Sequence, residues 1–84
     1  MDITRAEQRI LHLLAQGGWI EHGRCKAKIT HVKCFSRDGW LYPDFDLDLF
    51  RKLKRLKAIS SSKGQPYRIT GRGLVLVRAQ LNNR

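Results

Sequence analysis

Acidic side chains are absent from residues 49–84, which contain ten lysines and arginines. Residues 1–48 contain seven basic and seven acidic residues, so the whole net charge of +10 arises from the C-terminal part. Solubility does not require such a separation, whereas an anionic partner would explain it. The sequence therefore predicts nucleic acid or an acidic protein surface as the partner.

Long apolar runs and a signal sequence are also absent. No segment approaches the roughly 20 apolar residues that span a bilayer, and residues 1–4 lack the basic and apolar regions of a signal peptide. No long helix combines a basic face with large aromatic side chains, which disfavours a membrane surface as partner. We expect a cytoplasmic protein whose two cysteines, Cys25 and Cys34, stay reduced.

Signs of catalytic chemistry are missing as well. A chain of 84 residues fits one small domain and has little room for an enclosed active site. No carboxylate pair is placed for acid–base work. Ser60–Ser62 is followed by no histidine or acid, and Gly71-x-Gly73 is too short for a phosphate-binding motif. We expect a protein that is not an enzyme and needs no cofactor.

Residues 46–57 predict a cationic amphipathic helix with Asp46 as its N-terminal cap. The apolar positions recur at intervals of three and four residues and share one side: Leu49, Phe50, Leu53 and Leu56. The other side is basic and contains Arg51, Lys52, Lys54 and Arg55. A solvated surface is the usual reason for such a charged face, but the absence of any acid from residue 49 onwards favours a binding face.

A short hairpin is expected after this helix. Residues 58–62 and 67–70 are two extended runs, and Lys63–Pro66 forms the turn between them, with Gly64 supplying a positive φ angle. A basic helix followed by a small hairpin is how a winged helix presents its recognition helix and wing. The sequence therefore predicts an α+β fold, a single winged-helix-like domain over residues 1–84.

The N-terminal segment predicts a helix over residues 5–16. Thr4 and Glu7 fit a capping box, and Gly17 ends the helix. The expected apolar stripe consists of Ala6, Ile10, Leu13 and Leu14. A last helix is expected after Thr70, which can cap it, and its apolar face should cover the first helix.

Residues 19–42 predict β-structure. The candidate strands are rich in β-branched and aromatic residues and cover Trp19–His22, Ile29–Phe35 and Trp40–Tyr42. A winged helix would have the second helix of its helix-turn-helix in this region, but the helical period is weak. Either this helix is very short, near Tyr42–Phe45, or a hairpin replaces it.

Two histidines and two cysteines form the most regular chemical pattern, His22-x2-Cys25-x5-His31-x2-Cys34. Four such ligands close together in the sequence are typical of a tetrahedral zinc site. However, His31 and Cys34 are an odd number of residues apart, so a strand would point them to opposite faces. We therefore favour packed cysteines and exposed histidines over a metal site.

The candidate binding surface is the basic set of the helix and hairpin. These cations would contact phosphate groups or an acidic protein surface: Arg51, Lys52, Lys54, Arg55, Lys63, Arg68 and Arg72. Tyr67 is the only aromatic residue of the hairpin, which argues against stacking on single-stranded nucleic acid. Changing Arg51, Lys52 and Arg55 to glutamate is expected to abolish partner binding and to leave the fold intact.

Five sequence blocks match those of a known family in the same order. They are T-R-A-E-Q-R-I-L-H-L-L-A-Q-G-G, C-F-S-R-D-G, L-F-R-K-L-K, G-Q-P-Y-R-I-T and V-R-A-Q-L-N-N-R. With these blocks the chain resembles, over nearly its whole length, the YjhX family of small bacterial proteins. The resemblance implies a TopAI-like toxin of a toxin–antitoxin pair that binds DNA topoisomerase I and hinders its engagement with DNA. It also implies an acetyltransferase-like antitoxin as a second partner.

Two functions from different classes follow. The resemblance implies a toxin that binds topoisomerase I, whereas the charge separation and the helix–hairpin layout favour a winged-helix nucleic-acid-binding protein, such as a small transcriptional regulator. The salt dependence of binding separates these two functions. The logarithm of a DNA-binding constant falls as the logarithm of the salt concentration rises, with a slope of about −0.9 per neutralised phosphate.

Overall fold

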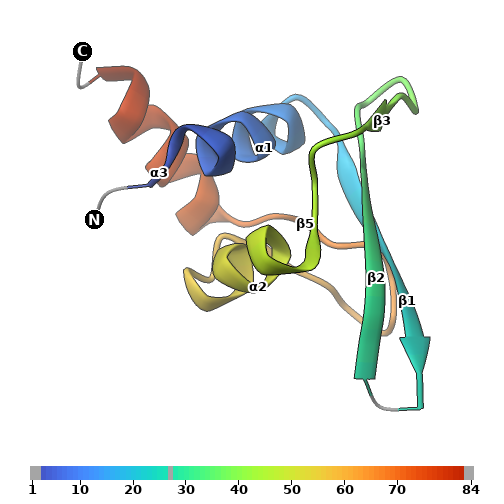
Figure 1. Cartoon of the computed structure of the whole chain (residues 1–84). Helices are drawn as coiled ribbons and strands as arrows, with labels where there is room; N and C mark the ends of the chain where they lie inside the picture. The colour runs from blue at the N-terminus through green and yellow to red at the C-terminus, as the bar shows by residue number, and fades with distance from the viewer. Residues whose placement is uncertain (1–2, 27, 83–84) are drawn as a thin grey trace.

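The computed structural model describes residues 3–26 and 28–82. In chain order these residues form α1 (Arg5–Ala15), β1 (Trp19–Cys25), β2 (Lys28–Phe35), β3 (Leu41–Tyr42), α2 (Leu47–Arg55), β4 (Ile59–Ser60), β5 (Arg68–Ile69) and α3 (Gly71–Asn82). The helices lie together, and the β1–β2 hairpin stands beside α2 and projects beyond it (Figure 1). The described residues thus form three helices and two sheets, which confirms the predicted α+β class.

Two small antiparallel sheets meet at the backbone of Ile20. The first sheet has the strand order β1–β2–β3, and the second pairs β4 with β5. Ile20 and Tyr67 exchange two backbone hydrogen bonds, 2.9 and 2.8 Å long, which join β1 to the segment that leads into β5. Strands lie in all the predicted segments, but their bounds differ: β1 extends as far as Cys25, β2 begins one residue earlier and β3 one residue later than expected, and β4 and β5 have only two residues each.

A three-stranded sheet occupies the position between α1 and α2. Tyr42 ends β3, and the next residues form a turn and an extended segment that leads into α2. Pro43 disfavours helical backbone angles at the residue before it, and Tyr42 is extended and pairs with Cys34 of β2. The alternative of a short helix near Tyr42–Phe45 is therefore wrong, and a hairpin takes its place.

Capping side chains set the helix boundaries as the sequence predicts. Thr4 N donates to Glu7 Oε1 at 2.9 Å, and Glu7 N donates to Thr4 Oγ1 at 3.2 Å, which completes the capping box of α1. Asp46 accepts a 2.9 Å hydrogen bond from a backbone amide in the first turn of α2. Thr70 does the same for α3, at 3.1 Å. These local hydrogen bonds satisfy amides that have no partner within their helix.

The β4–β5 hairpin closes through the predicted turn. Lys63 and Gly64 have φ angles of 54° and 76°, and Gln65 N donates to Ser62 O at 3.0 Å. Two successive positive φ angles are typical of a type I′ turn, whose twist suits a two-stranded hairpin. Gly64 therefore has the role that the sequence predicts, while the chain tolerates a lysine beside it.

Helix α3 packs closely against the chain that follows α2. A Cβ atom on Gly73 would lie 2.5 Å from Ala58 O and 2.7 Å from Ile69 Cγ1, so this contact requires a glycine. The Gly71-x-Gly73 pair thus has a packing role. As expected, α3 also contacts α1. Among the helices of residues 3–26 and 28–82, none is long and apolar enough to cross a bilayer.

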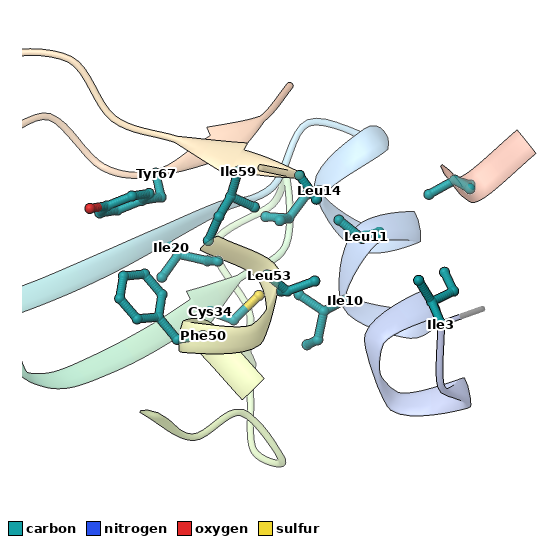
Figure 2. Close-up of a cluster of buried hydrophobic side chains, with 12 residues drawn as sticks. Ile3, Ile10, Leu11, Leu14, Ile20, Cys34, Phe50, Leu53, Ile59 and Tyr67 are labelled. Atoms are coloured by element: carbon teal, nitrogen blue, oxygen red, sulfur yellow. The ribbon is translucent and has the colours of Figure 1, made fainter. Parts of the chain in front are cut away.

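One hydrophobic cluster connects the helices to both sheets (Figure 2). Its largest fully buried apolar side chains are Phe50, Ile10, Leu11, Ile20, Leu53 and Cys34. The predicted stripe of α1 is correct for Ile10 and Leu14, but Ala6 is exposed and Leu13 is only partly buried. The helix is rotated so that Glu7 and Leu11 face inward instead, because the Glu7 carboxylate has a charged partner there.

Glu7 is a buried acid that ties α1 to α2. Its side chain is 2% exposed, and Oε2 lies 2.8 Å from Lys52 Nζ. Burial by itself would raise the pKa of Glu7. The hydrogen bonds from Lys52 and Thr4 and the Lys52 charge outweigh this effect, so the pKa is lowered from its ordinary value of 4.5. The carboxylate is therefore ionised at neutral pH and contributes to the packing of α1 on α2.

Stability is expected to decrease in acid because of this ion pair. Since the pKa of Glu7 is lower in the folded state than in the unfolded state, its contribution is full above the unfolded pKa and is lost as the pH falls through the folded pKa. Glu7→Gln should be less stable than the wild type at neutral pH, and the difference should narrow below about pH 4. Thermal unfolding of both proteins between neutral pH and below about pH 4 measures this stability difference. A difference that stays constant with pH would contradict the lowered pKa of Glu7.

Candidate binding surface

A cleft lined by basic residues lies between α2 and the far end of the β1–β2 hairpin. It has a volume of about 310 Å³. Its lining residues are Arg24, Lys28, Ile29, Leu47, Phe50, Arg51 and Lys54. Four of them are cations, and none of the described residues that line it is acidic. We refer to this site as the cationic cleft.

Two of the predicted cations, Arg51 and Lys54, form the helix wall of the cationic cleft. They are three residues apart on α2 and so share one side of it. Lys54 Nζ lies 5.8 Å from the ring centroids of both Phe50 and Tyr67, a favourable cation–π arrangement. Arg51 Nη1 lies 3.9 Å from Asp48 Oδ1, but these side chains are 55% and 95% exposed. Such an exposed pair stabilises little, so Arg51 can bind a partner.

The hairpin wall of the cleft was not predicted from the sequence. Arg24 and Lys28 belong to the half of the chain in which acids and bases balance, so the charge count gave them no weight. In the structure Arg24 pairs with Ile29 and Cys25 pairs with Lys28, which brings both cations to one end of the hairpin. Pairing of the two predicted strands across the turn near Lys26 would have indicated that Arg24 and Lys28 lie close together.

Lys52 lies outside the cationic cleft. Its ammonium group binds the buried Glu7 carboxylate on α1 instead of facing the hairpin. A glutamate at position 52 would place two carboxylates together at a buried site. The structure therefore corrects one expectation, because reversing Arg51, Lys52 and Arg55 together would damage the fold as well as any binding.

The other predicted cations are spread over separate surfaces. Lys63 and Arg68 line a second hollow, of about 410 Å³, on the β4–β5 hairpin. The Arg68 guanidinium carbon also lies 6.0 Å from the Trp19 ring centroid. Arg55 and Arg72 are exposed and line neither the cleft nor this hollow. Of the seven predicted residues, only Arg51 and Lys54 thus lie together with Arg24 and Lys28 of the β1–β2 hairpin.

The histidine and cysteine pattern is dispersed over the β1–β2 hairpin. Cys34 is buried in the core, where desolvation raises the pKa of its thiol to about 12, while Cys25 is exposed; neither forms a disulfide. His22 packs edge-on to the Tyr67 ring at 5.2 Å, and His31 is exposed. In the part of the chain that the structure describes, no three histidine, cysteine or acidic side chains come close enough to bind one metal ion.

Comparison with known proteins identifies the family. A model of the YjhX toxin family, described as "Putative toxin of bacterial toxin-antitoxin pair", matches residues 1–84. A UPF0386 protein of Rhizobium etli is 73% identical over 85 residues, with 100% of both chains covered. UPF0386 proteins of Rhizobium meliloti and Hyphomonas neptunium are 68% and 64% identical, covering 100% and 99% of each chain. No solved structure matches. The chain therefore belongs to the YjhX toxin family.

Proposed function

We propose that this protein is the toxin of a bacterial toxin–antitoxin pair and that it inhibits DNA topoisomerase I by binding to it. The cationic cleft carries the proposal, because it gathers Arg24 and Lys28 from the hairpin and Arg51 and Lys54 from α2. Oppositely charged surfaces steer association and fix its orientation. The toxin class follows from the family, and topoisomerase I as the target follows from the resemblance of the sequence blocks.

Inhibition through binding alone fits the chemistry of the site. The cationic cleft is lined by basic and apolar side chains, and the described lining residues include no nucleophile next to a base. A cationic surface cannot imitate DNA in a channel that binds DNA. We therefore propose that the cleft binds an acidic surface of topoisomerase I in the cytoplasm and hinders DNA engagement from there. An acetyltransferase-like antitoxin is the second proposed partner.

A second candidate function is nucleic-acid binding by a winged-helix arrangement. It is supported by the basic helix α2, which is followed by the β4–β5 hairpin with Lys63 in its turn. In this arrangement α2 would be the recognition helix and the hairpin would be the wing. A sheet replaces the second helix of the helix-turn-helix in the described chain, so we place this candidate after the first.

Binding measured at two salt concentrations separates these functions. The protein would be titrated with topoisomerase I from the same bacterium and, in parallel, with a generic DNA duplex, at low and at near-physiological salt. We expect topoisomerase binding that persists at the higher salt and duplex binding that falls steeply, by about −0.9 in log–log slope per phosphate contact. Duplex binding that resists salt and depends on sequence, without topoisomerase binding, would establish the second function instead.

A further inference from the structure

We propose that the cationic cleft receives an extended acidic peptide segment that carries an aliphatic side chain. This inference rests on the proposed function, because it names the kind of segment by which a protein partner is bound. Both the cations and the apolar side chains that line the cleft point to such an occupant.

The walls favour several carboxylates spaced along an extended chain. Arg24 and Lys28 come from the β1–β2 hairpin, and Arg51 and Lys54 come from α2, so cations from two elements line the space that an occupant would fill. Arginine can bind a carboxylate through two parallel hydrogen bonds, which gives the contact direction as well as strength. Lys54 is positioned by its cation–π contacts. Consecutive acidic residues would therefore find partners on both walls.

The apolar lining residues favour an aliphatic side chain over a nucleobase. Ile29 and Leu47 are partly buried and line the cleft, so an aliphatic group that covers them removes apolar surface from water. Bases stack on open aromatic faces or on arginine guanidinium planes. Phe50, the only aromatic residue among the described lining residues, is 2% exposed and packs edge-to-face with Phe45 and Tyr67 at 6.4 and 4.9 Å. A single-stranded nucleic acid would therefore find charge here but no open aromatic face among the described lining residues.

The test follows amide resonances of the isotope-labelled protein at near-physiological salt. One probe is the peptide Glu-Asp-Glu-Leu-Glu-Asp-Glu, a second has serine in place of leucine, and a third is an oligothymidylate of similar charge. We expect the leucine peptide to shift resonances of residues that line the cationic cleft. It should bind about tenfold or more tightly than the serine peptide, because leucine buries apolar surface that serine lacks.

A pair of double variants locates the site. Arg24→Ala with Arg51→Ala should weaken binding of the leucine peptide at least about tenfold. Arg9→Ala with Arg37→Ala, which removes the same charge from exposed positions outside the cleft, should not. Equal affinity for the two peptides, tighter binding of the oligothymidylate, shifts outside the cleft or equal losses in the two variants would each overturn the inference.

The same samples distinguish this inference from the proposed function. If the wild type binds topoisomerase I but none of the peptides, the inference is wrong and the proposed function stands. If the leucine peptide binds selectively in the cationic cleft but topoisomerase I does not bind, the cleft recognises acidic segments and the proposed target is wrong.

Discussion

Replacing Leu53 with alanine is expected to lower the free energy of unfolding by about 2–5 kcal/mol. Leu53 is completely buried and points from α2 into the cluster shared with α1 and the sheets (Figure 2). The loss combines the transfer free energy of the removed carbon atoms with the cavity that they leave, since packed neighbours relax only partly. Small domains have a total stability of about 5–15 kcal/mol. Denaturant unfolding should therefore show a large decrease in the midpoint.

Leu41→Ala is the matched control, because it makes the same chemical change at a site that is 54% exposed on β3. A substitution at such a surface position should change stability by no more than about 0.5 kcal/mol. Equal and small losses at positions 41 and 53 would show that α2 does not present Leu53 to the core.

Lys52→Glu is expected to destabilise the protein by about 2–4 kcal/mol. Removing one partner of a buried ion pair costs about 3–5 kcal/mol. In the wild type Lys52 Nζ lies 2.8 Å from Glu7 Oε2, so a glutamate at position 52 would also repel the Glu7 carboxylate. Because the Lys52 side chain is 48% exposed, solvent screens part of this effect and lowers the expected cost. Thermal unfolding at neutral pH measures the change.

Arg55→Glu gives the same charge reversal on the exposed side of α2. Its cost should stay within about 1 kcal/mol, mostly from placing an acid at the C-terminal end of a helix. The double variant Glu7→Gln with Lys52→Glu should recover part of the stability that Lys52→Glu loses, because the amide removes the repulsion. If Lys52→Glu and Arg55→Glu unfold alike, the link between α1 and α2 contributes nothing measurable.

Features fixed by neighbouring residues could be predicted from the sequence. The caps formed by Thr4, Asp46 and Thr70 depend on hydrogen bonds across three residues, so their spacing in the chain is enough to identify them. The turn at Gly64 depends on its own φ angle. For the same reason the helices and hairpins appear where periodicity and turn residues indicate.

Features that depend on tertiary contacts could not be predicted in this way. The inward position of Glu7 is stabilised by Lys52, which is distant in the sequence and lies on another helix. The cationic cleft requires the β1–β2 hairpin to lie beside α2, so cations from the charge-balanced half of the chain join those from the basic half. The distribution of charge along the chain therefore predicts the basic helix α2 but does not predict that Arg24 and Lys28 of the hairpin line the same cleft.

Inhibition of topoisomerase I tests the central claim, binding through the cationic cleft, most directly. The measurement is relaxation of supercoiled DNA by topoisomerase I in the presence of the wild type, of Arg24→Glu with Arg51→Glu, or of the control Arg9→Glu with Arg37→Glu. Circular dichroism confirms that each variant is folded. We expect the wild type and the control to inhibit relaxation, and the cleft variant to need at least about tenfold more protein for equal inhibition. A folded cleft variant that inhibits as strongly as the wild type would contradict the account.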